Sequence, residues 1–159
     1  MINQIKSEIW SQFGASLQML DDAITLCPID VWVDKRFWYI TYHTLFFMDY
    51  YTSQNPIDFI PPKPFTLSEL NKNYEMPPEI YSKEVLKDYL KTVKYQSFKL
   101  IQNLTEDNLK DKFKNNYIDF STFEMLLYTF RHTQHHVGQL NMILRSEKDI
   151  TPIWTSSHN

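Results

Sequence analysis

Hydrophobic positions recur at helical spacing in four stretches of the chain. Residues 2 to about 26 carry an apolar residue every three or four positions, and Pro28 ends the pattern. Residues 35–53 are apolar on almost every side, which predicts a second helix in the centre of the fold. Residues 82–104 combine an apolar stripe with outward lysines, and residues 121–148 form the fourth predicted helix.

The starts of the last two helices are marked by capping residues. Ser82 is a suitable N-cap for the third helix. Ser121-x-x-Glu124 reads as a capping box, in which the serine accepts from the helix backbone and the glutamate reaches back to the cap. Behind it, the apolar positions of the fourth helix are Phe123, Leu126, Phe130, Val137, Leu140 and Leu144.

The segments between the helices differ in kind. Residues 54–81 hold six of the eight prolines and predict a long crossover loop, either a lid over a site or a plain strap across the end of the helices. Residues 105–120 are polar and predict a connector with one helical turn, and the tail after Ile150 is expected to fold back. Four residues of the crossover loop are apolar enough to pack: Phe59, Ile60, Phe65 and Leu67.

Composition narrows the class of protein. The 159 residues suit a single domain over 1–159 and are 43% hydrophobic. A net charge of −3 argues against nucleic-acid and anionic-membrane partners. The chain begins without the apolar core of a signal peptide and has no run long enough to span a bilayer. The single Cys27 excludes an internal disulfide and fits a cytoplasmic location, as a buried small side chain or, alternatively, a reactive thiol.

Three of the five histidines crowd into the fourth predicted helix. At about 100° per residue, His132 and His136 fall on the flank of its apolar face, whereas His135 joins the polar arc. Imidazoles four residues apart share one face and can hold one metal ion. Two hydrogen-bonded histidines at a buried edge would give the same pattern, and His132 with His135 is a rival pair at three-residue spacing.

A further histidine, His43, lies in the aromatic second helix, where a buried polar group needs a partner. A hydrogen bond would satisfy it, and so would a metal ion shared with the fourth helix. His43, His132 and His136 together would form an open three-imidazole site. Tyr39 and Gln139 are candidate neighbours of that site.

No convincing Asp or Glu general base accompanies the histidines in the sequence. Asp49 is the only acid in the second helix, and it lies about 120° around the helix from His43, so a structural role is expected for it.

The order of these features resembles the DinB-like (DinB/YfiT-like) metal-binding superfamily. The matching residues are His43, then the long crossover, then His132 and His136 in an HxxxHxGQL motif. The family position after the second histidine is often basic, and here it is Val137. This departure leaves the three ligands intact, but a valine cannot make the contact to an anion that a basic residue at that position would make.

The resemblance implies an all-helical four-helix bundle, a homodimer, and nickel or zinc on the three histidines. It also implies a small-molecule substrate and a low-molecular-weight thiol as cosubstrate. The expected chemistry is activation of a bound water or thiol, in a transferase more than a hydrolase. The alternatives are a metal-binding protein without turnover and a helical interaction protein in which the histidines are only packed.

Overall fold

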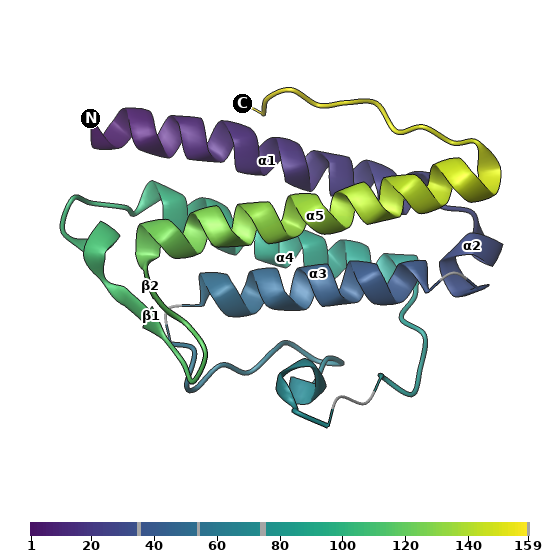
Figure 1. Cartoon of the computed structure of the whole chain (residues 1–159), viewed down its shortest axis with the longest axis horizontal. Helices are drawn as coiled ribbons and strands as arrows, with labels where there is room; N and C mark the ends of the chain where they lie inside the picture. Colours follow the sequence, from purple (N-terminus) through teal and green to yellow (C-terminus); the bar gives the residue numbers. More distant parts are fainter. Residues whose placement is uncertain (35, 54, 74–75, 159) are drawn as a thin grey trace.

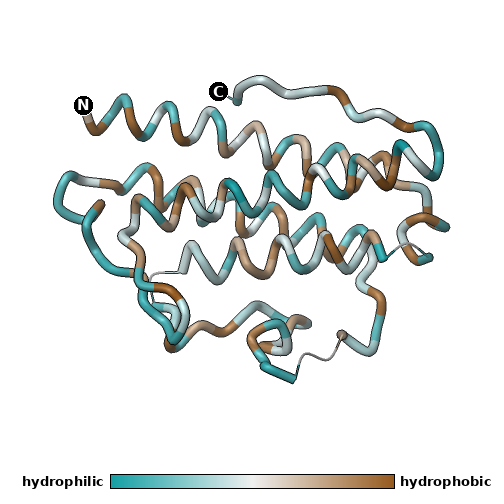
Figure 2. Tube along the Cα trace, viewed as in Figure 1, coloured by the Kyte–Doolittle hydropathy of each residue, from teal (hydrophilic) through white to brown (hydrophobic). Residues whose placement is uncertain are grey.

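The computed structural model describes residues 1–34, 36–53, 55–73 and 76–158. Its long axis is set by four helices that lie side by side (Figure 1): α1 (Ile2–Leu26), α3 (Phe37–Thr52), α4 (Lys83–Gln102) and α5 (Thr122–Lys148). Both α1 and α3 pack against α4 and α5. Apolar residues recur along each helix (Figure 2), as the spacing predicted, and the expectation of a mostly helical protein is confirmed.

Helix α3 is the most enclosed of the four. None of its residues is exposed, and its half-buried positions, Tyr39, Ile40, His43 and Phe47, follow one side of the helix. The prediction of a central helix over 35–53 is therefore correct. Its boundaries move inward to Phe37 and Thr52, and Lys35 lies outside the described residues.

Serine side chains cap α4 and α5 as predicted. The backbone N–H of Val85 donates to Ser82 Oγ at 3.3 Å, and the N–H of Glu124 donates to Ser121 Oγ at 3.2 Å. Within the described residues, the Glu124 side chain does not hydrogen-bond back to the backbone N–H of Ser121. Ser121 therefore acts as a simple N-cap, not as part of a full capping box.

Two short elements were not predicted. A helix, α2 (Ile29–Asp34), follows Pro28 directly, because a proline that ends one helix can also begin the next. The connector contains a hairpin of β1 (Lys112–Lys114) and β2 (Asp119–Ser121), paired antiparallel. Each strand has three residues, too few for an alternating pattern to be recognised. The predicted helical turn is present as η2 (Asn108–Lys110).

The chain between α3 and α4, called here the crossover segment, runs across the outer side of α3 and contains the turn η1 (Leu67–Leu70) (Figure 1). Phe65 anchors it by stacking between Tyr42 and Tyr89, at centroid distances of 5.4 and 4.2 Å. Phe59 is also buried. The prediction that apolar residues of this segment pack is therefore confirmed for Phe59 and Phe65. It is wrong for Ile60 and Leu67, which are 82% and 47% exposed.

The tail returns along α1, as expected (Figure 1). The N–H of His158 donates to the carbonyl of Ser11 at 3.0 Å, and its ring meets Trp10 at 5.7 Å. Gly14 makes room for this contact, because a Cβ there would lie 2.6 Å from His158 Cδ2. No helix among the described residues is both long and apolar enough to cross a membrane. That residues 1–159 form a single domain stays a prediction.

Asp49 is buried between α3 and α4, in the structural role expected for it. The hydroxyl of Tyr89 donates to Asp49 Oδ2 at 2.8 Å. Burial raises the pKa of the Asp49 carboxyl, and the hydrogen bond from Tyr89 opposes that rise in part. The native state therefore keeps the Asp49 proton to a higher pH than the unfolded chain does, and the free energy of unfolding falls as the pH rises above 3.8.

This linkage gives a signed prediction for two variants. Asp49→Asn should be more stable than the wild type at pH 7, and the difference should shrink as the pH falls toward 4, because the carboxyl of the unfolded wild type also begins to take up its proton there. Tyr89→Phe should lower the free energy of unfolding by about 1–3 kcal/mol, because it leaves a buried carboxyl without its donor. Urea titrations from pH 4 to 7 measure both effects. A difference between wild type and Asp49→Asn that does not change with pH would contradict the linkage.

Candidate metal centre

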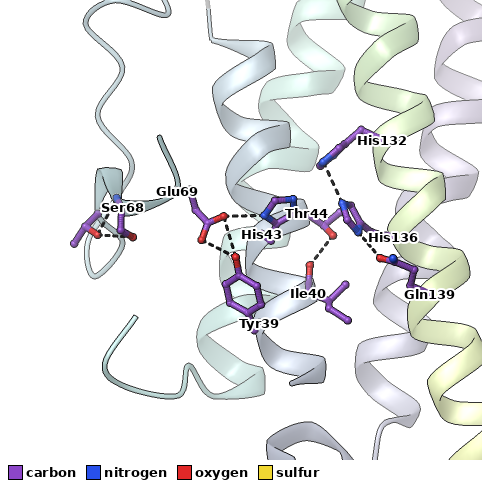
Figure 3. A network of polar contacts seen from close by, with 10 residues as sticks. Tyr39, Ile40, His43, Thr44, Ser68, Glu69, His132, His136 and Gln139 are labelled. Atoms are coloured by element: carbon purple, nitrogen blue, oxygen red, sulfur yellow. Dashed lines mark hydrogen bonds and ion pairs between the residues drawn. The ribbon is translucent and has the colours of Figure 1, made fainter. Parts of the chain in front are cut away.

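Three histidines from α3 and α5 converge between these two helices (Figure 3). The ring centroids of His132 and His136 are 4.5 Å apart, and that of His43 lies 5.4 Å from the first and 4.9 Å from the second. One nitrogen from each ring lies within 4.8 Å of the other two. In the described part of the chain, this is the one group of histidine, cysteine or acidic side chains arranged to hold a metal ion.

The spacing of the α5 pair suits a shared ion. Nε2 of His132 and Nε2 of His136 are 3.1 Å apart. Two nitrogens that each lie about 2.0–2.1 Å from one zinc-sized ion are separated by about 2.9–3.4 Å when they occupy adjacent coordination positions. The four-residue spacing on one helix therefore brings the two nitrogens to the separation that chelation needs.

A carboxylate from the crossover segment holds His43. Nδ1 of His43 lies 2.7 Å from Oε2 of Glu69, and the Tyr39 hydroxyl lies 3.1 and 3.3 Å from the two Glu69 oxygens. The Glu69 side chain is only 1% exposed. Because a carboxylate can only accept, the tautomer of the neutral His43 ring that fits this contact has its proton on Nδ1 and a lone pair on Nε2. Figure 3 shows Glu69 on the side of His43 away from the other two histidines.

The two α5 histidines are held differently. Nδ1 of His136 lies 2.7 Å from Oε1 of Gln139, so this ring too can donate from Nδ1 and offer Nε2. Nδ1 of His132 is buried and has no hydrogen-bond partner among the described residues. The His132 ring is positioned by its Nε2 contact with His136 at 3.1 Å and by packing against Phe47 at 5.7 Å and Tyr51 at 5.9 Å.

Burial and mutual repulsion keep the α5 pair uncharged. Desolvation, followed by the neighbouring charges of His136 and His43, lowers the pKa of His132 to about 3. Desolvation also lowers the pKa of His136, although its hydrogen bond to Gln139 works in the opposite direction. Neutral imidazole is the form that binds a metal ion, so both side chains are in the required state at neutral pH.

The centre is open on one side. All three histidines are half-buried, not enclosed. A cavity of about 300 Å³ adjoins the group and is lined by Tyr128, Arg131, His132 and His135. Arg131 lies over the Tyr128 ring, 5.1 Å from its centroid, which places a cation at the rim.

The remaining sequence candidates lie outside the group. His135 is exposed, on the polar arc where the helical phase placed it, and its ring meets His136 at 5.0 Å. Cys27 is buried, and desolvation raises its pKa to about 11, which disfavours the thiolate and supports the packing role over the reactive one. Val137 is fully buried, so this position offers nothing to a solvent-borne anion.

Sequence reasoning missed Glu69. It looked for an acid within the helices and found none convincing, whereas the acid that contacts His43 lies 26 residues away in the crossover segment. No periodicity marks that segment, so spacing could not have found this residue.

The chain matches no protein-family model, no curated protein and no solved structure.

The depressed pKa of His132 predicts how stability depends on pH in chelator-treated protein. As the pH falls below 6.5, His132 takes up a proton in the unfolded chain, whereas in the native state it stays neutral down to about pH 3. The free energy of unfolding should therefore decrease as the pH falls from 6.5 toward 3. His132→Phe should flatten the slope, because a ring of similar shape stays neutral. His135→Phe, on the exposed arc, is the matched control and should follow the wild type. Equal slopes in all three proteins would contradict the assigned cause.

Proposed function

We propose that this chain binds one divalent metal ion through His43, His132 and His136. The observation that carries the proposal is the convergence of three imidazole nitrogens within 4.8 Å, two of them 3.1 Å apart. Hydrogen bonds on the opposite ring edges of His43 and His136 support it, since such bonds orient metal-ligating histidines in general. Imidazole donors without cysteine favour zinc or nickel over magnesium or calcium.

We further propose membership of the DinB-like superfamily, with the four long helices as its four-helix bundle and the crossover segment as its long connection. The support is the order of features: one histidine on α3, a long segment, then a histidine pair on α5 followed by Gly138-Gln139-Leu140. The homodimer and the cytoplasmic location belong to the same proposal.

The activity we propose is transfer of a small electrophilic substrate to a low-molecular-weight thiol. A divalent ion on three neutral imidazoles supplies Lewis acidity, which lowers the pKa of a bound thiol or water. The chain itself supplies the lone pairs of the histidines, an open side for ligands, and aromatic walls from Phe47 and Tyr51. Metal binding without turnover is the alternative.

Metal content per chain tests the ligand assignment. Wild-type protein loaded with zinc or nickel and desalted should retain about one ion per chain. His43→Ala, His132→Ala and His136→Ala should each lose it, because two imidazoles make a weak site. His135→Ala and His158→Ala are the controls and should retain it. Elemental analysis of the six proteins gives the answer, and loss in His135→Ala with retention in His136→Ala would exclude this set of ligands.

A conjugation assay tests turnover. Metal-loaded protein, cysteine or glutathione, and a chromogenic aryl halide should yield a thioether, with halide and a proton released, faster than the same reagents without protein. His136→Ala should return the rate to that background, and His135→Ala should not. A wild-type rate equal to background for metal-loaded protein would favour the non-catalytic alternative for these substrates.

A further inference from the structure

Glu69 is the point at which the crossover segment reaches the metal centre. Three polar contacts converge on its carboxylate: Nδ1 of His43 at 2.7 Å and the Tyr39 hydroxyl at 3.1 and 3.3 Å (Figure 3). Burying a carboxylate costs free energy unless it is hydrogen-bonded, so these partners are what hold Glu69 in its buried position.

Within the described parts of the chain, few other contacts fix the turn that carries Glu69. Glu69 is the one buried residue of η1, and the neighbouring Leu67 and Leu70 are exposed. The N-cap of the turn is Thr66, whose Oγ1 accepts a hydrogen bond from the N–H of Ser68 at 3.4 Å, so this contact is internal to the segment. The aromatic anchor of the segment, Phe65, packs against α3 and α4 just before the turn begins. The position of η1 on α3 therefore depends on the His43–Glu69–Tyr39 contact.

We propose that Glu69 is a positioning residue for the metal ligand His43, and that metal loading and docking of η1 are coupled through this one hydrogen bond. The proposal rests on the proposed metal site. Glu69 holds the proton of His43 on Nδ1 and fixes the ring, so that Nε2 faces the α5 pair. An ion that draws electron density from Nε2 makes the Nδ1–H a stronger donor, which tightens the contact to the carboxylate.

The coupling is reciprocal. If a docked η1 raises the affinity for the ion, then the bound ion must favour the docked η1 by the same factor. Docking of η1 in this way reports metal loading. Glu69 approaches His43 from the side away from the α5 pair (Figure 3), so it does not compete with the ion for Nε2.

Gln139 provides a matched control within the same site. Its Oε1 accepts from Nδ1 of His136 at 2.7 Å, the same kind of contact that Glu69 makes with His43. Gln139 belongs to α5, however, and not to the crossover segment. Removing it should weaken the metal site without releasing η1.

The first measurement is zinc affinity, by competition with a chromophoric chelator, for full-length wild type, Glu69→Ala, Glu69→Gln and Gln139→Ala. Glu69→Ala and Gln139→Ala should each weaken binding by about 10–100-fold. Glu69→Gln keeps an acceptor oxygen for Nδ1–H and should recover most of the loss. A wild type that binds no zinc would overturn the proposed function itself, and this coupling with it. Wild-type affinity in Glu69→Ala would overturn both the positioning role and the coupling, because the two effects are reciprocal, and it would leave the proposed metal site standing.

The second measurement is amide hydrogen exchange at Ser68 and Asn71, whose N–H groups hydrogen-bond within the turn. Saturating zinc should slow this exchange in wild type, Glu69→Gln and Gln139→Ala, but not in Glu69→Ala. Exchange in the middle of α1 should match wild type in every variant, which verifies folding. Zinc-dependent protection in Glu69→Ala equal to that of the wild type, or none in the wild type at saturation, would refute the coupling.

Discussion

Every polar side chain on α3 must find a partner inside the protein, because no residue of this helix is exposed. The threonines satisfy themselves: Thr41, Thr44 and Thr52 donate to carbonyls four residues earlier in the same helix. Several other polar side chains of α3 contact neighbouring elements. Asp49 accepts from Tyr89 on α4, the Tyr50 hydroxyl accepts from Asn115 in the hairpin turn, and His43 meets Glu69 as well as the α5 pair. The polar groups of α3 thus orient the elements around it, while the apolar groups supply the burial.

The fold was predictable wherever a local pattern was long enough to show a period. Apolar stripes predicted α1, α4 and α5, a long segment that is apolar on almost every side predicted α3, and serine caps located the starts of α4 and α5. Six-residue α2 and the three-residue strands are shorter than any window in which a period can be seen. In the crossover segment, where no period exists, apolar character alone was correct for Phe65 and wrong for Ile60, since burial there depends on which side of the segment faces α3.

The candidate site also contains residues that a local pattern predicted and one residue that no local pattern could predict. Helical phase on α5 separates His132 and His136 from His135, and the aromatic surroundings of His43 imply a buried polar group in need of a partner. These two local arguments lead to the three side chains that the structure brings together. Glu69 required knowledge of the tertiary path of a segment with several prolines, which no spacing rule supplies. Sequence patterns on regular helices identify the three candidate metal ligands, but they do not identify Glu69, the acid that orients His43.

The balance of charge around the three histidines argues for what the open side of the centre accepts. Neutral imidazoles leave the charge of a divalent ion uncompensated, and burial makes that charge costly. Glu69 offsets part of it through the ring of His43, to which its carboxylate is hydrogen-bonded. The rim adds a further positive charge at Arg131, which lines the adjoining cavity. Under the proposed metal loading, a centre of this composition keeps a net positive charge, which favours an anionic exchangeable ligand over a neutral or cationic one.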